Sequence, residues 1–127
     1  IVNRPQMTAQ LEQMIDKCKF IMELYEYETL FLATEDLEYF EIMIKEFGRQ
    51  CLSIDQKRVY YDYHTGYKLC ADLLKLENGK EFGRRYLAIV QSLANCKSLL
   101  TNVYNNTAWM AKTLNDSKYE YFEVIGL

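Results

Sequence analysis

Apolar residues recur every three or four positions along most of this chain, which is the spacing of amphipathic helices. One such stripe predicts a first helix over Thr8–Tyr27. Another predicts a second helix over Glu35–Cys51, with Thr34 as its N-cap because a threonine hydroxyl can accept from the first free backbone amides. Gly48 falls inside this second helix, where glycine costs roughly 1 kcal/mol relative to alanine.

The helical pattern continues through the second half of the chain. Residues 55–63 predict a short or irregular helix, and residues 67–77 predict a further helix with one apolar face. Near the end, the pattern predicts a helix over Asn102–Leu114, capped by Thr101, and a last helical piece over Lys118–Ile125. No segment alternates between apolar and polar residues as a half-buried strand does, and no internal repeat is visible, so we expect an all-α fold.

The most apolar predicted helix starts near Lys80, after the break at Gly79, and ends near Leu100. Every residue over Tyr86–Val90 is apolar, which predicts a helix that is surrounded by other helices. The exposed N-terminal end of this central helix then carries Gly83 and Arg84. An always-charged guanidinium in that place suggests contact with something outside the core.

The composition limits the classes of protein to which this chain can belong. The chain has 127 residues, 50% of them hydrophobic and 26% charged, which is ordinary for a single globular domain covering residues 1–127. A net charge of −3 argues against a nucleic-acid surface. No apolar run is long enough to cross a membrane and no signal peptide opens the sequence, so we expect an intracellular protein without a transmembrane anchor.

The cysteines and the glycosylation sequons leave open the alternative that the protein is secreted. The sequons at Asn105 and Asn115 would be acceptors in a secreted protein, and a disulfide pair would fit the same compartment. A zinc site would need paired cysteines or nearby histidines, and the chain has one histidine, so we expect no metal and no cofactor. The four cysteines are widely spaced, at Cys18, Cys51, Cys70 and Cys96.

Enzymatic chemistry finds little support in the sequence. His64, with Arg58 upstream, resembles the spacing of small helical ribonucleases, but Val59 is a poor match beside it. No nucleophile elbow or phosphate-binding loop occurs, so no catalytic residues are predicted. The abundant aromatic residues, 14% of the chain, instead suit a helical protein with a groove for an amphipathic helix.

Four segments resemble the Bcl-2 family. Ala108–Asp116 is similar to the AWMA-x-x-LND run of the family's sixth helix, and Asn78–Arg84 resembles its first homology region. Ile44–Arg49 is similar to the core of the third region, and Tyr121 stands where the second region has a tryptophan. The resemblance covers about 37–126 and implies a Bcl-2-like bundle of amphipathic helices around a central hydrophobic helix.

The resemblance also implies a ligand groove. In the family, the arginine matching Arg84 pairs with an aspartate of the ligand helix, and the glycine matching Gly83 lets the ligand backbone approach. Glu81 replaces an asparagine of the motif, which predicts a narrower range of ligands. Arg49 replaces an acidic residue, which favours a pro-survival role over a killer role. The expected groove residues are Arg84, Gly83, Glu81, Phe82, Phe47, Ile44, Cys51, Leu73 and Tyr121.

This combination resembles a viral pro-survival homologue of the iridovirus or poxvirus type. Such a protein inhibits apoptosis by binding the amphipathic helix of host pro-apoptotic proteins that are Bim-like or Bak/Bax-like. It would act in the host cell cytoplasm, with recruitment to the mitochondrial surface and a homodimer left open. The alternatives are a Bcl-2-fold inhibitor of innate immune (NF-κB) signalling and, more distantly, the small helical ribonuclease.

Overall fold

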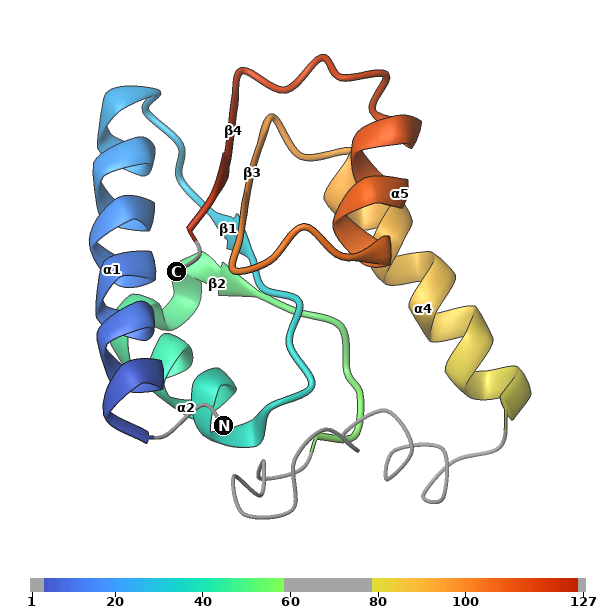
Figure 1. Cartoon of the computed structure of the whole chain (residues 1–127), viewed down its shortest axis with the longest axis horizontal. Helices are drawn as coiled ribbons and strands as arrows, with labels where there is room; N and C mark the ends of the chain where they lie inside the picture. Colours follow the sequence, from blue (N-terminus) through green and yellow to red (C-terminus); the bar gives the residue numbers. More distant parts are fainter. Residues whose placement is uncertain (1–3, 59–78, 126–127) are drawn as a thin grey trace.

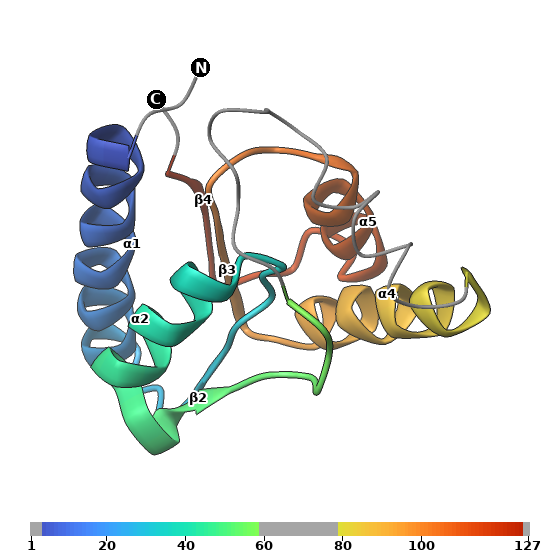
Figure 2. The same cartoon turned by 90° about the horizontal axis from the view of Figure 1, so that it is seen from below.

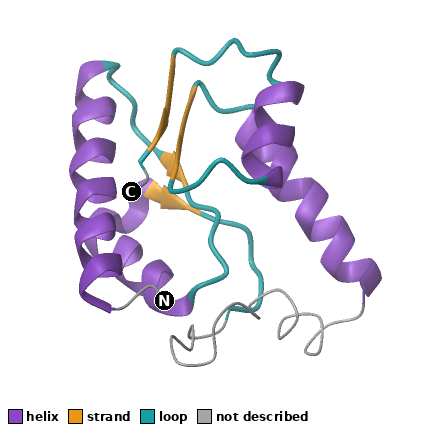
Figure 3. Cartoon of the chain, viewed as in Figure 1, coloured by secondary structure: helices purple, strands orange, loops and turns teal. Residues whose placement is uncertain are grey.

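Helices dominate the part of the chain that the computed structural model describes, residues 4–58 and 79–125 (Figures 1 and 3). The chain is therefore mostly helical, which is the coarser part of the all-α expectation, but it also contains short strands. The elements follow in the order α1 (Arg4–Leu24), β1 (Leu30–Phe31), α2 (Leu37–Phe47), the 3-10 turn η1 (Gly48–Gln50), β2 (Cys51–Leu52), α4 (Gly79–Ala94), β3 (Ser98–Thr101), α5 (Asn106–Leu114) and β4 (Tyr121–Val124).

The same order of elements occurs twice. A helix, a strand, a second helix and a second strand make up residues 4–52, the first unit, and residues 79–124, the second unit. In each unit the two strands pair in parallel, with Leu30 opposite Cys51 in the first and Leu99 opposite Phe122 in the second. Parallel neighbours need a crossover connection, which α2 and α5 provide. The expected absence of strands is therefore corrected.

The strands lie between the two pairs of helices, with α1 and α2 on one side and α4 and α5 on the other (Figures 1 and 2). Each unit has its own cluster of buried side chains. The units also exchange residues, because Ile125 is buried in the first cluster while Phe31 packs against the second. The first cluster consists of Leu11, Met14, Cys18, Leu32, Met43, Phe47, Cys51 and Ile125, and the second of Leu93, Leu99 and Ala111.

The second helix is shorter than predicted at both ends. Asp36, not Thr34, is its N-cap, because the Asp36 side chain accepts from the amides of Glu38 (3.0 Å) and Tyr39 (3.4 Å). Thr34 instead accepts a 3.2 Å hydrogen bond from the Asp36 amide. Gly48 lies at the C-cap with φ of 56°, a left-handed value that glycine adopts without strain. The glycine thus ends the helix rather than interrupting it.

The central helix is not surrounded by others, which corrects the sequence-based expectation. α4 ends at Ala94, six residues before Leu100, because Ser98–Thr101 pairs with β4 as a strand. Leu87 is 62% exposed, and the buried residues of α4 lie in its last turns. The polar residues Lys80, Glu81, Arg84 and Gln91 share one face with Leu87 and keep it in solvent, so α4 is amphipathic.

The C-terminal segment also differs from its prediction. α5 begins at Asn106, where Asn105 caps it by accepting from the Ala108 amide at 3.0 Å, so Thr101 is not the cap. Residues 118–125 do not form a helix, since Asp116 and Ser117 take left-handed φ values of 58° and 53° and turn the chain away. The chain then returns beside β3 as β4. The segment that resembles the second homology region is therefore a strand.

The helix expected over 67–77 lies outside the described residues. Within residues 4–58 and 79–125, no helix is both long enough and apolar enough to cross a membrane.

Candidate functional site

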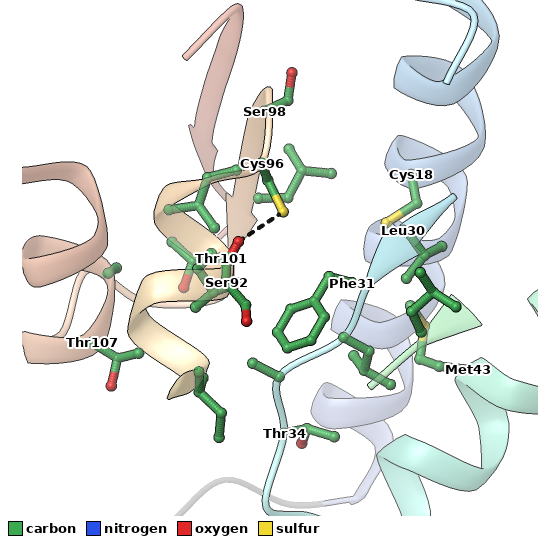
Figure 4. Close-up of a pocket in the computed structure, with 18 of the residues that line it drawn as sticks. Cys18, Leu30, Phe31, Thr34, Met43, Ser92, Cys96, Ser98, Thr101 and Thr107 are labelled. Carbon is green, nitrogen blue, oxygen red and sulfur yellow. Dashed lines mark hydrogen bonds between the residues drawn. The ribbon is translucent and has the colours of Figure 1, made fainter. Parts of the chain in front are cut away.

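The candidate site is a cavity between the two units. Its volume is about 1040 Å³, somewhat above the roughly 300–1,000 Å³ of most small-molecule sites. The first unit contributes α1, β1, α2 and the loops around β1, and the second contributes α4, β3 and the start of α5. Figure 4 shows the Phe31 ring pointing into this space, between Ser92 on one wall and Leu30 and Met43 on the other.

Side chains of α4 form one wall at regular spacing. Phe82, Tyr86 and Ile89 lie at i, i+4 and i+7, so they share one face of the helix and line the cavity together. The Tyr86 hydroxyl is held in place, because it donates to the Met110 sulfur at 3.8 Å and accepts from the Thr107 hydroxyl at 3.2 Å. This wall is therefore largely apolar, and contacts with α5 hold its tyrosine.

Two side-chain hydrogen bonds join the units at the cavity. The hydroxyls of Tyr27 and Ser98 lie 2.7 Å apart, and the Tyr39 hydroxyl donates to the Asn102 side chain at 3.4 Å. Burial raises the pKa of Tyr39, so this phenol stays protonated and remains a donor. The cavity therefore has a largely apolar interior with neutral polar groups that tie its two walls together.

The charges around the cavity are mostly negative. Its charged lining residues in the described chain are Glu26, Glu28, Glu35 and Lys97, of which only Glu35 is half-buried. Burial raises the pKa of Glu35, and the neighbouring Arg85 guanidinium lowers it by less than burial raises it. The Glu35 carboxylate is therefore only partly compensated.

Of the residues expected from the sequence to form a groove, Phe82 lines this cavity. Arg84 does not, because it is two residues from both Phe82 and Tyr86 and so lies on the opposite face of α4. Its side chain is 66% exposed and forms an ion pair with Glu81 at 3.6 Å. A side chain added at Gly83 would meet nothing within 4 Å, so the space beside it is open.

The other expected groove residues lie elsewhere. Phe47 and Cys51 are buried in the first cluster, and Ile44 packs against it. Tyr121 lies in β4, where its hydroxyl contacts Glu123. Leu73 lies outside the described residues. The structure therefore does not bring the expected groove residues together at one surface.

β1 and the loop after it are one part of the cavity lining that the sequence interpretation missed. Leu30, Phe31 and Leu32 form a short apolar run between polar neighbours. Such a run is consistent with a buried strand, and this signal could have identified it. Because the run is short, helical periodicity alone assigns it to the connection between two predicted helices.

The resemblance to helical ribonucleases gains no support from Arg58. Its guanidinium donates to the carbonyls of Thr34 (3.0 Å) and Ile54 (3.1 Å) and lies 3.8 Å from the centre of the Phe40 ring. Arg58 therefore holds two loops together. His64 lies outside the described residues.

Both sequon asparagines have structural roles. The Asn105 side chain caps α5, as described above. The Asn115 side chain donates to the Ala94 carbonyl at 2.9 Å and accepts from the Lys118 amide at 2.6 Å. A glycan on Asn115 would be attached to the nitrogen that contacts the Ala94 carbonyl, which favours the unmodified state at Asn115. The Asn105 cap uses the amide oxygen, which glycosylation leaves free to accept.

Cys18, Cys51 and Cys96 are free thiols, and Cys18 and Cys51 are buried in the same cluster. Burial raises the pKa of Cys18 to about 11. Since the thiolate is the reactive form, we expect alkylation of Cys18 at pH 8 to be about 100-fold slower in the folded protein than in urea. Mass spectrometry of iodoacetamide-treated protein measures this rate. Equal rates in both states would show that the Cys18 thiol is accessible in the fold.

Within the described ranges, no group of three or more His, Cys, Asp or Glu side chains is arranged to hold a metal ion. Comparison with protein-family models, with curated proteins and with solved structures finds no match to this chain.

Proposed function

We propose that this chain is a non-catalytic, pro-survival protein that binds the amphipathic helix of a pro-apoptotic Bcl-2 protein in the cavity between its units. By sequestering Bim-like or Bak/Bax-like helices in the host cell cytoplasm, it would inhibit apoptosis. The observation that carries the proposal is the stripe of Phe82, Tyr86 and Ile89, which lines a cavity of about 1040 Å³. An apolar stripe on a visiting helix would bury its side chains against such a wall.

The motif resemblance supplies the identity of the ligand, and the geometry of α4 modifies how it would bind. In the family pattern the ligand pairs with the arginine matching Arg84, but this side chain lies on the face of α4 away from the cavity. Two binding modes are therefore distinguishable. In the mode that we favour the ligand lies in the cavity against Phe82, and in the other it lies on the exposed face beside Arg84.

We expect fluorescently labelled Bim-like and Bak-like helical peptides to bind the purified chain with nanomolar to low-micromolar affinity, measured by anisotropy. Phe82→Ala should weaken this binding about 30-fold, because an aromatic anchor in a pocket is worth about 2 kcal/mol. Arg84→Ala should change the affinity less than about threefold, since exposed charges contribute little.

Leu87→Ala is the matched control, because Leu87 lies on the exposed face of the same helix and is 62% exposed. It should leave the affinity within about twofold of the original value. A larger loss with Arg84→Ala than with Phe82→Ala would move the ligand to the exposed face. If no peptide of the panel binds at all, the proposed function is wrong.

A further inference from the structure

Glu35 is a half-buried carboxylate in the wall of a mainly apolar cavity. No described residue forms a hydrogen bond or an ion pair with it, although Arg85 acts on it electrostatically. It is not needed to cap α2, because the adjacent Asp36 accepts both amide hydrogen bonds. A carboxylate in such a place costs free energy unless a partner compensates its charge.

The backbone on both sides of Glu35 is held by hydrogen bonds. The carbonyl of Thr34 accepts from Arg58 Nε at 3.0 Å, and the Thr34 hydroxyl accepts from the amide of Asp36 at 3.2 Å. Asp36 is itself tied to the first turn of α2 as its N-cap. The backbone at Glu35 is therefore held before any ligand arrives, and such preorganisation lowers the entropic cost of binding.

The surroundings of Glu35 favour a cation. Among the residues that the structure describes, the other charged ones lining the cavity are Glu26, Glu28 and Lys97, all exposed, so this part of the lining carries more negative than positive charge. Arg85 is the described basic residue that acts on Glu35, and it only partly offsets the burial of the carboxylate. Charge complementarity in a low-dielectric cavity selects a ligand group of opposite sign.

We propose that Glu35 is a specificity-determining residue that pairs with a lysine or arginine of the bound helix. This inference rests on the proposed function, since it assigns a second requirement to the same ligand. The helix must then carry an apolar stripe for Phe82, Tyr86 and Ile89 and a basic residue that faces the loop between β1 and α2.

The test is a double-mutant cycle with the tightest peptide of the Bim-like and Bak-like panel. Each lysine and arginine of that peptide is replaced in turn by glutamine, and every peptide is titrated against the original chain and against Glu35→Gln. We expect Glu35→Gln to weaken the original peptide about tenfold. One glutamine-containing peptide should bind both proteins equally, because its partner charge is already lost.

Glu28→Gln is the matched control, because Glu28 also lines the cavity but is exposed, and it should change the affinity less than twofold. Glu35→Gln should retain the original thermal stability or exceed it, since burial disfavours the charged form of Glu35. If peptides bind but every substitution is additive with Glu35→Gln, or if Glu35→Gln tightens binding, the pairing is wrong while the proposed function stands. If no peptide binds the original chain, both fail together.

Discussion

Met43→Ala is expected to lower the free energy of unfolding by about 3 kcal/mol, which is typical for truncating a buried methionine. Met43 is 1% exposed and lies on α2 in the first cluster, where it contributes to the wall of the cavity as well. Its removal takes apolar contacts from the first cluster, which includes side chains of α1. Because the surrounding side chains relax only partly, the space that it leaves adds to the loss of burial.

Urea unfolding followed by far-UV circular dichroism measures this loss, and Ile42→Ala provides the control. Ile42 precedes Met43 on the same helix and is 36% exposed, so its truncation should cost less than about 1 kcal/mol. Similar losses for the two variants would show that α2 does not bury the face described above.

The helices were predictable because their signals are local. The apolar stripes over α1 and α2 depend on neighbours within one or two turns, and both helices are present. The predicted ends of α2 were wrong because the local sequence allowed two interpretations at each end. Thr34 and Asp36 are both good N-caps, and only the hydrogen bonds of the structure decide between them. Gly48 could be tolerated inside a helix or could end it, and its left-handed φ settles the question.

The strands could not be predicted for a different reason. β1 and β2 have two residues each. In each unit, the two strands that pair are separated in the sequence by a helix. Ser98–Thr101 extends an apolar helical pattern, so sequence alone continues α4 through it. Its pairing with β4 outweighs that local preference. Tertiary contacts of this kind are invisible to periodicity.

The candidate site was predictable only in part. Phe82 is expected to contact a ligand and does line the cavity, but nothing in the sequence distinguishes Glu35 from the neighbouring Asp36. The structure separates the pair, because Asp36 caps α2 while Glu35 faces the cavity. Arg84 and Arg85 are equally charged in the sequence, and the helical rotation between them decides which one acts on Glu35.

Ile125→Ala is expected to destabilise the whole chain by about 3 kcal/mol, even though Ile125 follows the last strand of the second unit. Ile125 is 7% exposed and belongs to the first cluster, and its amide donates to the Thr101 carbonyl at 2.7 Å. The neighbouring Val124→Ala is the control. Val124 is 38% exposed, so its truncation should cost less than about 1 kcal/mol.

The reason for a global effect is that side chains cross between the units: Ile125 is buried in the first cluster, and the partly buried Phe31 packs against the second. If each cluster needs a residue from the other unit, the two units must unfold together. Fluorescence of Trp109, the single tryptophan, reports on the second unit, while circular dichroism includes the long helix α1. Both signals should shift to lower urea by the same amount in Ile125→Ala. Two separate midpoints would mean that the units fold independently, and a cavity between them would then not keep a fixed shape for a ligand.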